Sequence, residues 1–179
     1  MKYALSASRL VMTIMVLFGF ASAFGQTTSS PTVTAQEAFA MLKNLAGEWT
    51  GTIQEKDKGP AGSVIYKVTA NGNVVLETLF PGTEHEMVTT YYLKGDQLML
   101  THYCASGNHP MMALDKQSTK NLLVFAFAGA VNFDPEKDTH MHNARFRLVD
   151  NDHFESEWDH YQNGKNAGPA KFFLTRKKS

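Results

Sequence analysis

From residue 48 to the C-terminus, apolar and polar residues alternate in short runs that are separated by turn signals. Alternation with a period of two places successive side chains on opposite faces of a β-strand. Asn71-Gly72 and Gly95-Asp96 are dipeptides that favour the tight turns of antiparallel hairpins. The pattern predicts strands at 48–56, 62–70, 73–80, 86–93, 97–105, 109–115, 121–128, 141–149, 152–161 and 169–177.

The fold class that these strands predict is all-β, an antiparallel up-and-down β-barrel of about ten strands. An even number of strands makes the first and last strands antiparallel, so that they can pair and leave no exposed edge. The segment 109–115 has the weakest strand pattern, and simple closure depends on it. No βαβ spacing is present, which argues against a parallel sheet.

A short helix is predicted before the first strand. Residues 34–37 (Thr-Ala-Gln-Glu) match a capping box, in which the first and last side chains satisfy each other's free backbone donors. Phe39, Leu42 and Leu45 follow at helical spacing, and Gly47 suits the end of a helix. We expect this helix to close one end of the barrel.

The N-terminal segment has the pattern of a signal peptide. Lys2 and Arg9 make the start of the segment positively charged. Residues 10–20 are an apolar run, and Ala21-Ser22-Ala23 is a small-x-small cleavage site. A retained membrane anchor is the alternative, although the run is short for a span. The predicted organisation is a signal peptide at 1–23, a flexible leader at 24–33 and a barrel domain at 34–179. We therefore expect a periplasmic or secreted protein with no stable membrane span after cleavage.

Composition excludes several classes of function. The chain has 179 residues, 43% of them hydrophobic and 19% charged, which suits one globular domain. Its formal net charge is zero and it has no basic block, so we expect no nucleic-acid partner. Cys104 is the single cysteine, so no disulfide can form within the chain. No serine nucleophile elbow or phosphate-binding loop is present, which favours a binding protein over an enzyme.

Gly47, Trp49 and Arg176 carry a resemblance to a known family. A helix that leads into Gly-x-Trp, an antiparallel meander and a lone arginine near the end of the last strand resemble the calycin pattern of lipocalins. In those families the arginine lies across the tryptophan and closes one end of the barrel. The resemblance implies a structural role for these three residues in a lipocalin-like barrel.

The chain departs from typical lipocalins because it lacks their disulfide and has more strands. The stretch 100–104 (Leu-Thr-His-Tyr-Cys), with Asn108 and Pro110, is also similar to uncharacterised exported bacterial lipocalin-like proteins. That second resemblance implies no function.

Alternation predicts which side chains face the interior. Trp158 and His160 oppose an acidic face, so they are expected inside. A three-residue loop at 150–152 would place His142 opposite His160 and Ala144 opposite Trp158, with His142 also inside.

The earlier strands add three more inward side chains, Tyr66, His102 and Cys104. Glu77 is ambiguous. A strict Asn71-Gly72 turn places it inside, whereas a slipped register places it outside.

Strand direction then predicts where these side chains lie along the barrel. With Trp49 marking one end, an alternating meander puts the reactive side chains at the other end: His102, Cys104, His142 and His160. Of the seven histidines only His153 falls at the Trp49 end.

The function that we predict is the binding of a small, mainly apolar molecule inside the barrel, with a histidine-rich mouth. The predicted ligand-binding residues are Tyr66, His102, Cys104, His142, Trp158 and His160. The aromatic side chains could instead simply fill the barrel as core.

A metal-dependent enzyme, or a metal-binding or haem-binding protein, is the alternative function. It would use the same histidine and cysteine cluster, with His102, His142 and His160 as candidate ligands. No tight ligand spacing such as HExxH or CxxC supports it, and the sequence identifies no cofactor. A structural or interaction module in the cell envelope is the third interpretation.

Overall fold

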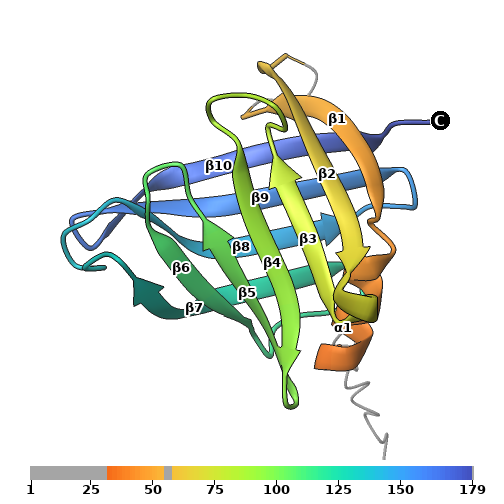
Figure 1. Ribbon diagram of the computed structural model, residues 1–179, viewed down its shortest axis with the longest axis horizontal. Helices are drawn as coiled ribbons and strands as arrows, with labels where there is room; N and C mark the ends of the chain where they lie inside the picture. The colour runs from red at the N-terminus through yellow and green to blue at the C-terminus, as the bar shows by residue number, and fades with distance from the viewer. Residues whose placement is uncertain (1–31, 55–57, 179) are drawn as a thin grey trace, which may run out of the picture.

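The computed structural model describes residues 32–54 and 58–178. The predicted signal peptide, and the predicted leader up to residue 31, lie outside the described residues. Ten antiparallel strands form a closed barrel in the order β1-β10-β9-β8-β7-β6-β5-β4-β3-β2, which confirms the predicted fold class (Figure 1). Their bounds are β1 Gly47–Ile53, β2 Ala61–Thr69, β3 Val74–Leu79, β4 Met87–Lys94, β5 Gln97–Tyr103, β6 His109–Leu114, β7 Leu122–Val131, β8 His140–Leu148, β9 His153–Gln162 and β10 Lys165–Arg176.

Every predicted strand is present, including β6 at the position with the weakest pattern. The first and last strands pair antiparallel, with Trp49 opposite Arg176 and Gly51 opposite Leu174. Closure therefore follows the even number of strands, as expected from the meander.

The helix α1 (Ala35–Lys43) begins with the predicted capping box. The Thr34 hydroxyl accepts from the Glu37 backbone N–H at 3.2 Å, and the Glu37 carboxylate accepts from the Thr34 N–H at 2.9 Å. Phe39 and Leu42 on the inner side of the helix are buried in the same core cluster as the barrel interior. In Figure 1 the helix lies across one end of the barrel, as predicted.

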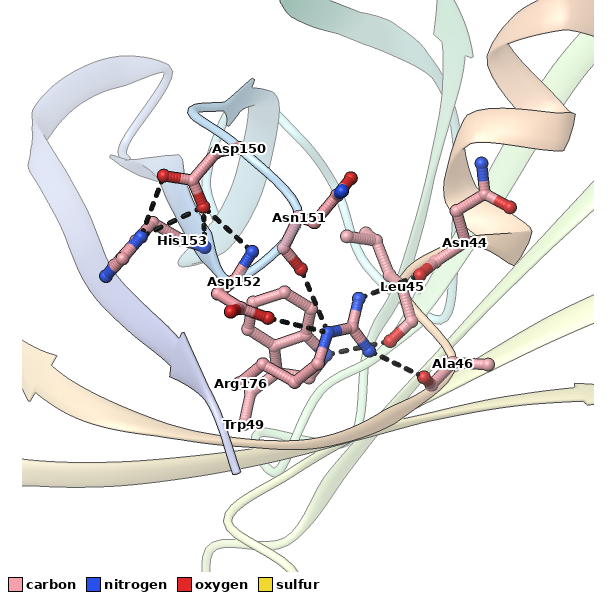
Figure 2. A network of polar contacts seen from close by, with 9 residues as sticks. All are labelled: Asn44, Leu45, Ala46, Trp49, Asp150, Asn151, Asp152, His153 and Arg176. Carbon is pink, nitrogen blue, oxygen red and sulfur yellow. Dashed lines mark hydrogen bonds and ion pairs between the residues drawn. The ribbon is translucent and has the colours of Figure 1, made fainter. Parts of the chain in front are cut away.

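Trp49 and Arg176 close that same end (Figure 2). The Arg176 guanidinium carbon lies 4.3 Å from the centre of the Trp49 ring. Its nitrogens donate to the backbone carbonyls of Ala46 at 2.8 Å and Asn44 at 2.9 Å, just beyond α1. Gly47 has a φ of 129°, and a Cβ there would lie 3.2 Å from Arg176 Nη1. These contacts give Gly47, Trp49 and Arg176 the structural role that the resemblance implies.

Large side chains fill much of the barrel interior. The largest fully buried ones are Trp49, Trp158, Tyr66, Tyr91, Phe125, Phe146 and Phe154. Phe146 packs against four of these rings, with centroid distances of 5.5–5.9 Å. The interpretation of these aromatic side chains as core is thus correct for the part of the barrel nearer α1.

The pairing of β8 with β9 corrects one prediction. Ala144 lies opposite Trp158, as expected from the three-residue loop. The register then shifts, so that Met141, and not His142, lies opposite His160. His142 is the extra residue of a β-bulge, which breaks the alternation of inward and outward side chains.

Among the described residues, no helix is both long and apolar enough to cross a membrane.

Candidate functional site

Four polar side chains form one row across neighbouring strands on the inner face of the barrel. Tyr66 on β2 lies opposite Glu77 on β3, Glu77 opposite Thr89 on β4, and Thr89 opposite His102 on β5. All four residues are at most 2% exposed. Directly opposite residues on antiparallel strands are close enough for their side chains to interact, so the register alone brings this row together.

The Glu77 carboxyl is held by hydroxyl donors. Tyr66 and Tyr91 each donate to one of its oxygens at 2.6 Å. Burial raises the pKa of Glu77, while hydrogen bonds from Tyr66, Tyr91 and Thr89 lower it, and the net direction is upward. The pKa values of both tyrosines are raised well above the ordinary value, first by burial and then by the nearby Glu77.

His102 continues the row toward the end of the barrel opposite to Trp49. Its Nδ1 lies 3.0 Å from the Thr89 hydroxyl, and its ring centre lies 5.1 Å from that of Trp158. Burial lowers the pKa of His102 to about 4. The imidazole is therefore neutral near pH 7, with one nitrogen carrying a proton and the other a lone pair.

His102 and Trp158 line a cavity of about 170 Å³. Its other walls are apolar: Ile53, Leu79, Phe80, Met87, Met141, Ala170 and Phe172. Several of these residues lie at strand ends remote from α1, so the cavity belongs to the half of the barrel that Trp49 does not fill.

Two polar atoms of the residues that line this cavity lack a hydrogen-bond partner. His102 Nε2 and Trp158 Nε1 are buried and have no hydrogen-bond partner among the described residues. Most buried polar atoms in folded proteins have a partner, because leaving one without costs about 1–3 kcal/mol. Both nitrogens have almost no accessible surface, so they lie behind the apolar atoms that face the cavity.

The structure brings only part of the predicted site together. His102 and Trp158 line the cavity, and Tyr66 is inside as predicted, but its hydroxyl is already bonded to Glu77. His160 lies opposite Met141, which makes its position inward-facing, yet it is not among the residues that line the cavity.

Cys104 lies beyond the end of β5, in the turn that leads to β6. It is half-buried, and its sulfur accepts a hydrogen bond from the Ser106 hydroxyl at 3.1 Å. The predicted strand 97–105 therefore ends two residues early, and Cys104 is not part of the cavity wall.

His142 is not inside the barrel, which corrects the prediction. Its ring stacks between Tyr161 and Phe127, at centroid distances of 4.0 and 4.4 Å. Tyr161 lies next to the inward-facing position of His160, so it and His142 belong to the outer face. There His142 Nδ1 lies 2.9 Å from His140 Nε2.

The three candidate metal ligands are consequently divided between two faces of the sheet. His102 is buried inside the barrel, whereas His142 is on its outer face. Within residues 32–54 and 58–178, no three histidine, cysteine or acidic side chains are grouped as metal ligands would be.

Sequence reasoning missed Thr89, Tyr91 and Met141, and left the face of Glu77 open. The signal for Glu77 was available, because the Asn71-Gly72 turn in its strict register is the one that the structure adopts. Thr89 and Tyr91 alternate with outward residues on β4 and could have been identified in the same way. Met141 could not, because the bulge at His142 reverses its expected face.

Comparison with known proteins supports the fold. The crystal structure of Rv2717c from M. tuberculosis matches with a TM-score of 0.50 and 14% sequence identity, over 79% of this chain and 98% of that one. A DUF3598-family protein of unknown function from Nostoc punctiforme PCC 73102 (Npun_R4044) matches with a TM-score of 0.41 and 12% identity, over 87% of this chain. This chain covers 53% of the Nostoc chain.

No family model matches the sequence, and no curated protein is significantly similar to it. The likeness to Rv2717c concerns the fold alone.

Proposed function

We propose that this protein binds a small, mainly apolar molecule in the cavity beside His102 and Trp158. The observation that carries the proposal is the cavity itself, whose accessible surface is entirely apolar. Apolar walls favour a hydrophobic ligand.

The size of the cavity limits the ligand. At about 170 Å³ it is smaller than the pockets of about 300–1,000 Å³ that hold drug-sized ligands. An engineered apolar cavity of about 150 Å³ in another protein binds benzene. A water molecule would occupy only about 30 Å³ and leave most of the apolar wall without contacts. The proposed ligand is therefore about the size of one aromatic ring.

Filling the cavity should abolish binding. Ala170 is part of the cavity wall, so Ala170→Leu would place a larger apolar side chain in the space. We expect toluene to bind the unmodified protein, measured by calorimetry or by NMR shifts of the cavity methyl groups, and to lose at least about tenfold in affinity in the variant. The matched control is Ala167→Leu, an exposed position on the same strand.

Absence of toluene binding in a folded, unmodified protein would contradict the proposal. Equal binding by the Ala170→Leu and Ala167→Leu variants would show that the ligand lies elsewhere, which would also overturn it.

The proposal includes export, which rests on the N-terminal pattern. We expect cleavage after Ala23, so that the exported protein begins at Phe24. Intact mass of the exported protein tests this, with Ala23→Leu as the variant that removes the small residue before the cut. Unprocessed chain confined to the cytoplasm would contradict it.

A further inference from the structure

Phe80, directly after β3, has a strained backbone conformation. Its φ of 52° lies in the left-handed region, which bulky side chains rarely adopt. Pro81 follows it, and a proline restricts the preceding residue mainly to extended conformations with negative φ. Of the six described non-glycine residues with a positive φ, Phe80 is the only aromatic one. Such strain persists only where surrounding contacts impose it, and it is concentrated at functional sites.

Contacts with Ser63, Thr83 and Phe172 hold Phe80 in this conformation. The Phe80 backbone N–H donates to the Ser63 carbonyl on β2 at 2.9 Å. The Phe80 carbonyl accepts from the Thr83 N–H at 3.2 Å and from the Thr83 hydroxyl at 2.9 Å. The centre of the Phe80 ring lies 5.9 Å from that of Phe172 on β10. These contacts therefore impose a conformation that the local sequence disfavours.

Phe80 also lies at the mouth of the apolar cavity. Four of the lining residues are buried, whereas five are partly exposed and so form the rim: Ile53, Phe80, Met87, Met141 and Ala170. Phe80 is the only one of these five that lies outside a strand. It begins the connection between β3 and β4, and residues 82–86 of that connection are exposed. This part of the rim can therefore move while the strands of the barrel stay paired.

We propose that Phe80 is the gate through which an apolar ligand enters the cavity; this rests on the binding function proposed above. In the closed state, which the structure shows, φ is positive and the Phe80 ring narrows the mouth. In the open state, the Phe80 backbone relaxes to the extended conformation that Pro81 favours, and the ring leaves the rim. The open state needs to be only a small fraction of the population. The ligand enters and leaves through that state.

The Thr83 hydroxyl stabilises the closed state. It is a side-chain donor to the Phe80 carbonyl, so a substitution can remove it and leave the backbone hydrogen bonds of Phe80 in place. Its removal should increase the population of the open state. Because the gate must open for both entry and exit, the rate constants of association and dissociation should rise by the same factor. The affinity should then stay the same.

The first experiment measures the exchange of toluene by NMR in the unmodified protein and in two variants. Thr83→Val removes the hydroxyl, so both rate constants should rise about fivefold. Thr83→Ser keeps a hydroxyl at this position and is the matched control, which should leave both rate constants nearly unchanged. Unchanged rate constants in Thr83→Val would overturn the gate. Absence of toluene binding by the folded, unmodified protein would instead overturn the proposed binding function.

The second experiment predicts a change of opposite sign. Pro81→Ala removes the restriction on Phe80, so the closed conformation is less strained and more favoured. Both rate constants for toluene should fall about threefold. A general loosening of the barrel would raise the rate constants in Thr83→Val and Pro81→Ala alike, so a rise in Pro81→Ala would overturn the gate. Unchanged rate constants in Pro81→Ala would overturn it too, because strain at Phe80 would then not control opening.

Discussion

The Thr89 hydroxyl lies between two titratable side chains, Glu77 and His102, and all three residues are almost fully buried. Thr89 is paired with Glu77 on one neighbouring strand and with His102 on the other, because β4 lies between β3 and β5. Burial shifts the two pKa values in opposite directions, upward for Glu77 and downward for His102. In both cases burial disfavours the charged form.

The lowered pKa of His102 predicts a specific dependence of stability on pH. The unfolded chain takes up a proton at the ordinary value of 6.5, whereas the folded protein does so only at about 4. Between these values the unfolded state binds more protons, so the free energy of unfolding falls as the pH falls, by roughly 3 kcal/mol across this window. Glu77 acts in the opposite sense, because a raised pKa favours the folded state at low pH.

Urea unfolding between pH 4 and 7.5 measures this dependence. The free energy of unfolding of the unmodified protein should fall below pH 6.5, and His102→Gln should lose most of this fall. The effect of Glu77 on the pH dependence is present in both proteins. His85→Gln is the control, because the His85 side chain is 75% exposed. Parallel curves for the unmodified protein and His102→Gln would contradict the prediction.

At the scale of elements, the N-terminal helix, the first strand and the last strand meet at one guanidinium group. Arg176 donates to carbonyls that follow α1, covers Trp49 at the start of β1 and also donates to the Asn151 carbonyl at 2.9 Å. The planar guanidinium makes all of these contacts at the same time, whereas a lysine ammonium cannot. Arg176 thus joins the helix to the barrel.

Arg176→Ala should therefore be strongly destabilising. The loss of charged hydrogen bonds and of the contact with Trp49 is expected to cost about 2–4 kcal/mol, measured by urea unfolding. The neighbouring Lys177→Ala breaks only an ion pair whose side chains are 60% and 56% exposed, so it should change stability by less than about 1 kcal/mol. Similar costs for the two variants would refute the proposed role of Arg176.

The β-bulge on β8 is the second feature at this scale, and it determines which face His142 and Met141 occupy. β7 pairs with β8 only as far as Phe125 and Ala144, and beyond them the Asn143 side chain accepts from the Phe127 N–H at 3.1 Å. One additional residue at that point moves His142 to the outer face and puts Met141 into the cavity wall. A change of one residue is enough because the side-chain period of a strand is two.

At the scale of the whole molecule, closure depends on a close approach between β1 and β10. Gly51 lies opposite Leu174, and a Cβ at Gly51 would meet the Phe173 carbonyl oxygen at 1.8 Å. No side chain fits there without separating the first strand from the last. The glycine is therefore required by the seam of the barrel.

Gly51→Ala should open this seam. We expect a loss of about 3 kcal/mol or more in the free energy of unfolding, since backbone must move to relieve the contact. Hydrogen exchange should show faster exchange of β1 and β10 amides, while those of β5 and β6 stay protected. Thr50→Ala, at an exposed position next in the sequence, should cost no more than about 1 kcal/mol. Unchanged protection at the seam in Gly51→Ala would contradict this account.

Local patterns in the sequence determined the capping box, all ten strands, the closed barrel and the end at which Trp49 and Arg176 meet. These features follow from nearest-neighbour chemistry and from side-chain periodicity, which are properties of short segments. The same local patterns also identified three inward-facing residues, His102, Trp158 and Tyr66.

Only the tertiary structure decided which of these residues share a site. The bulge removed His142 from the interior, the early end of β5 left Cys104 in a turn, and hydrogen bonding to Glu77 engaged the Tyr66 hydroxyl. Each outcome depends on contacts between strands that are distant from the residue in the sequence. What remains is a small apolar cavity beside His102 and Trp158, because large side chains fill much of the interior.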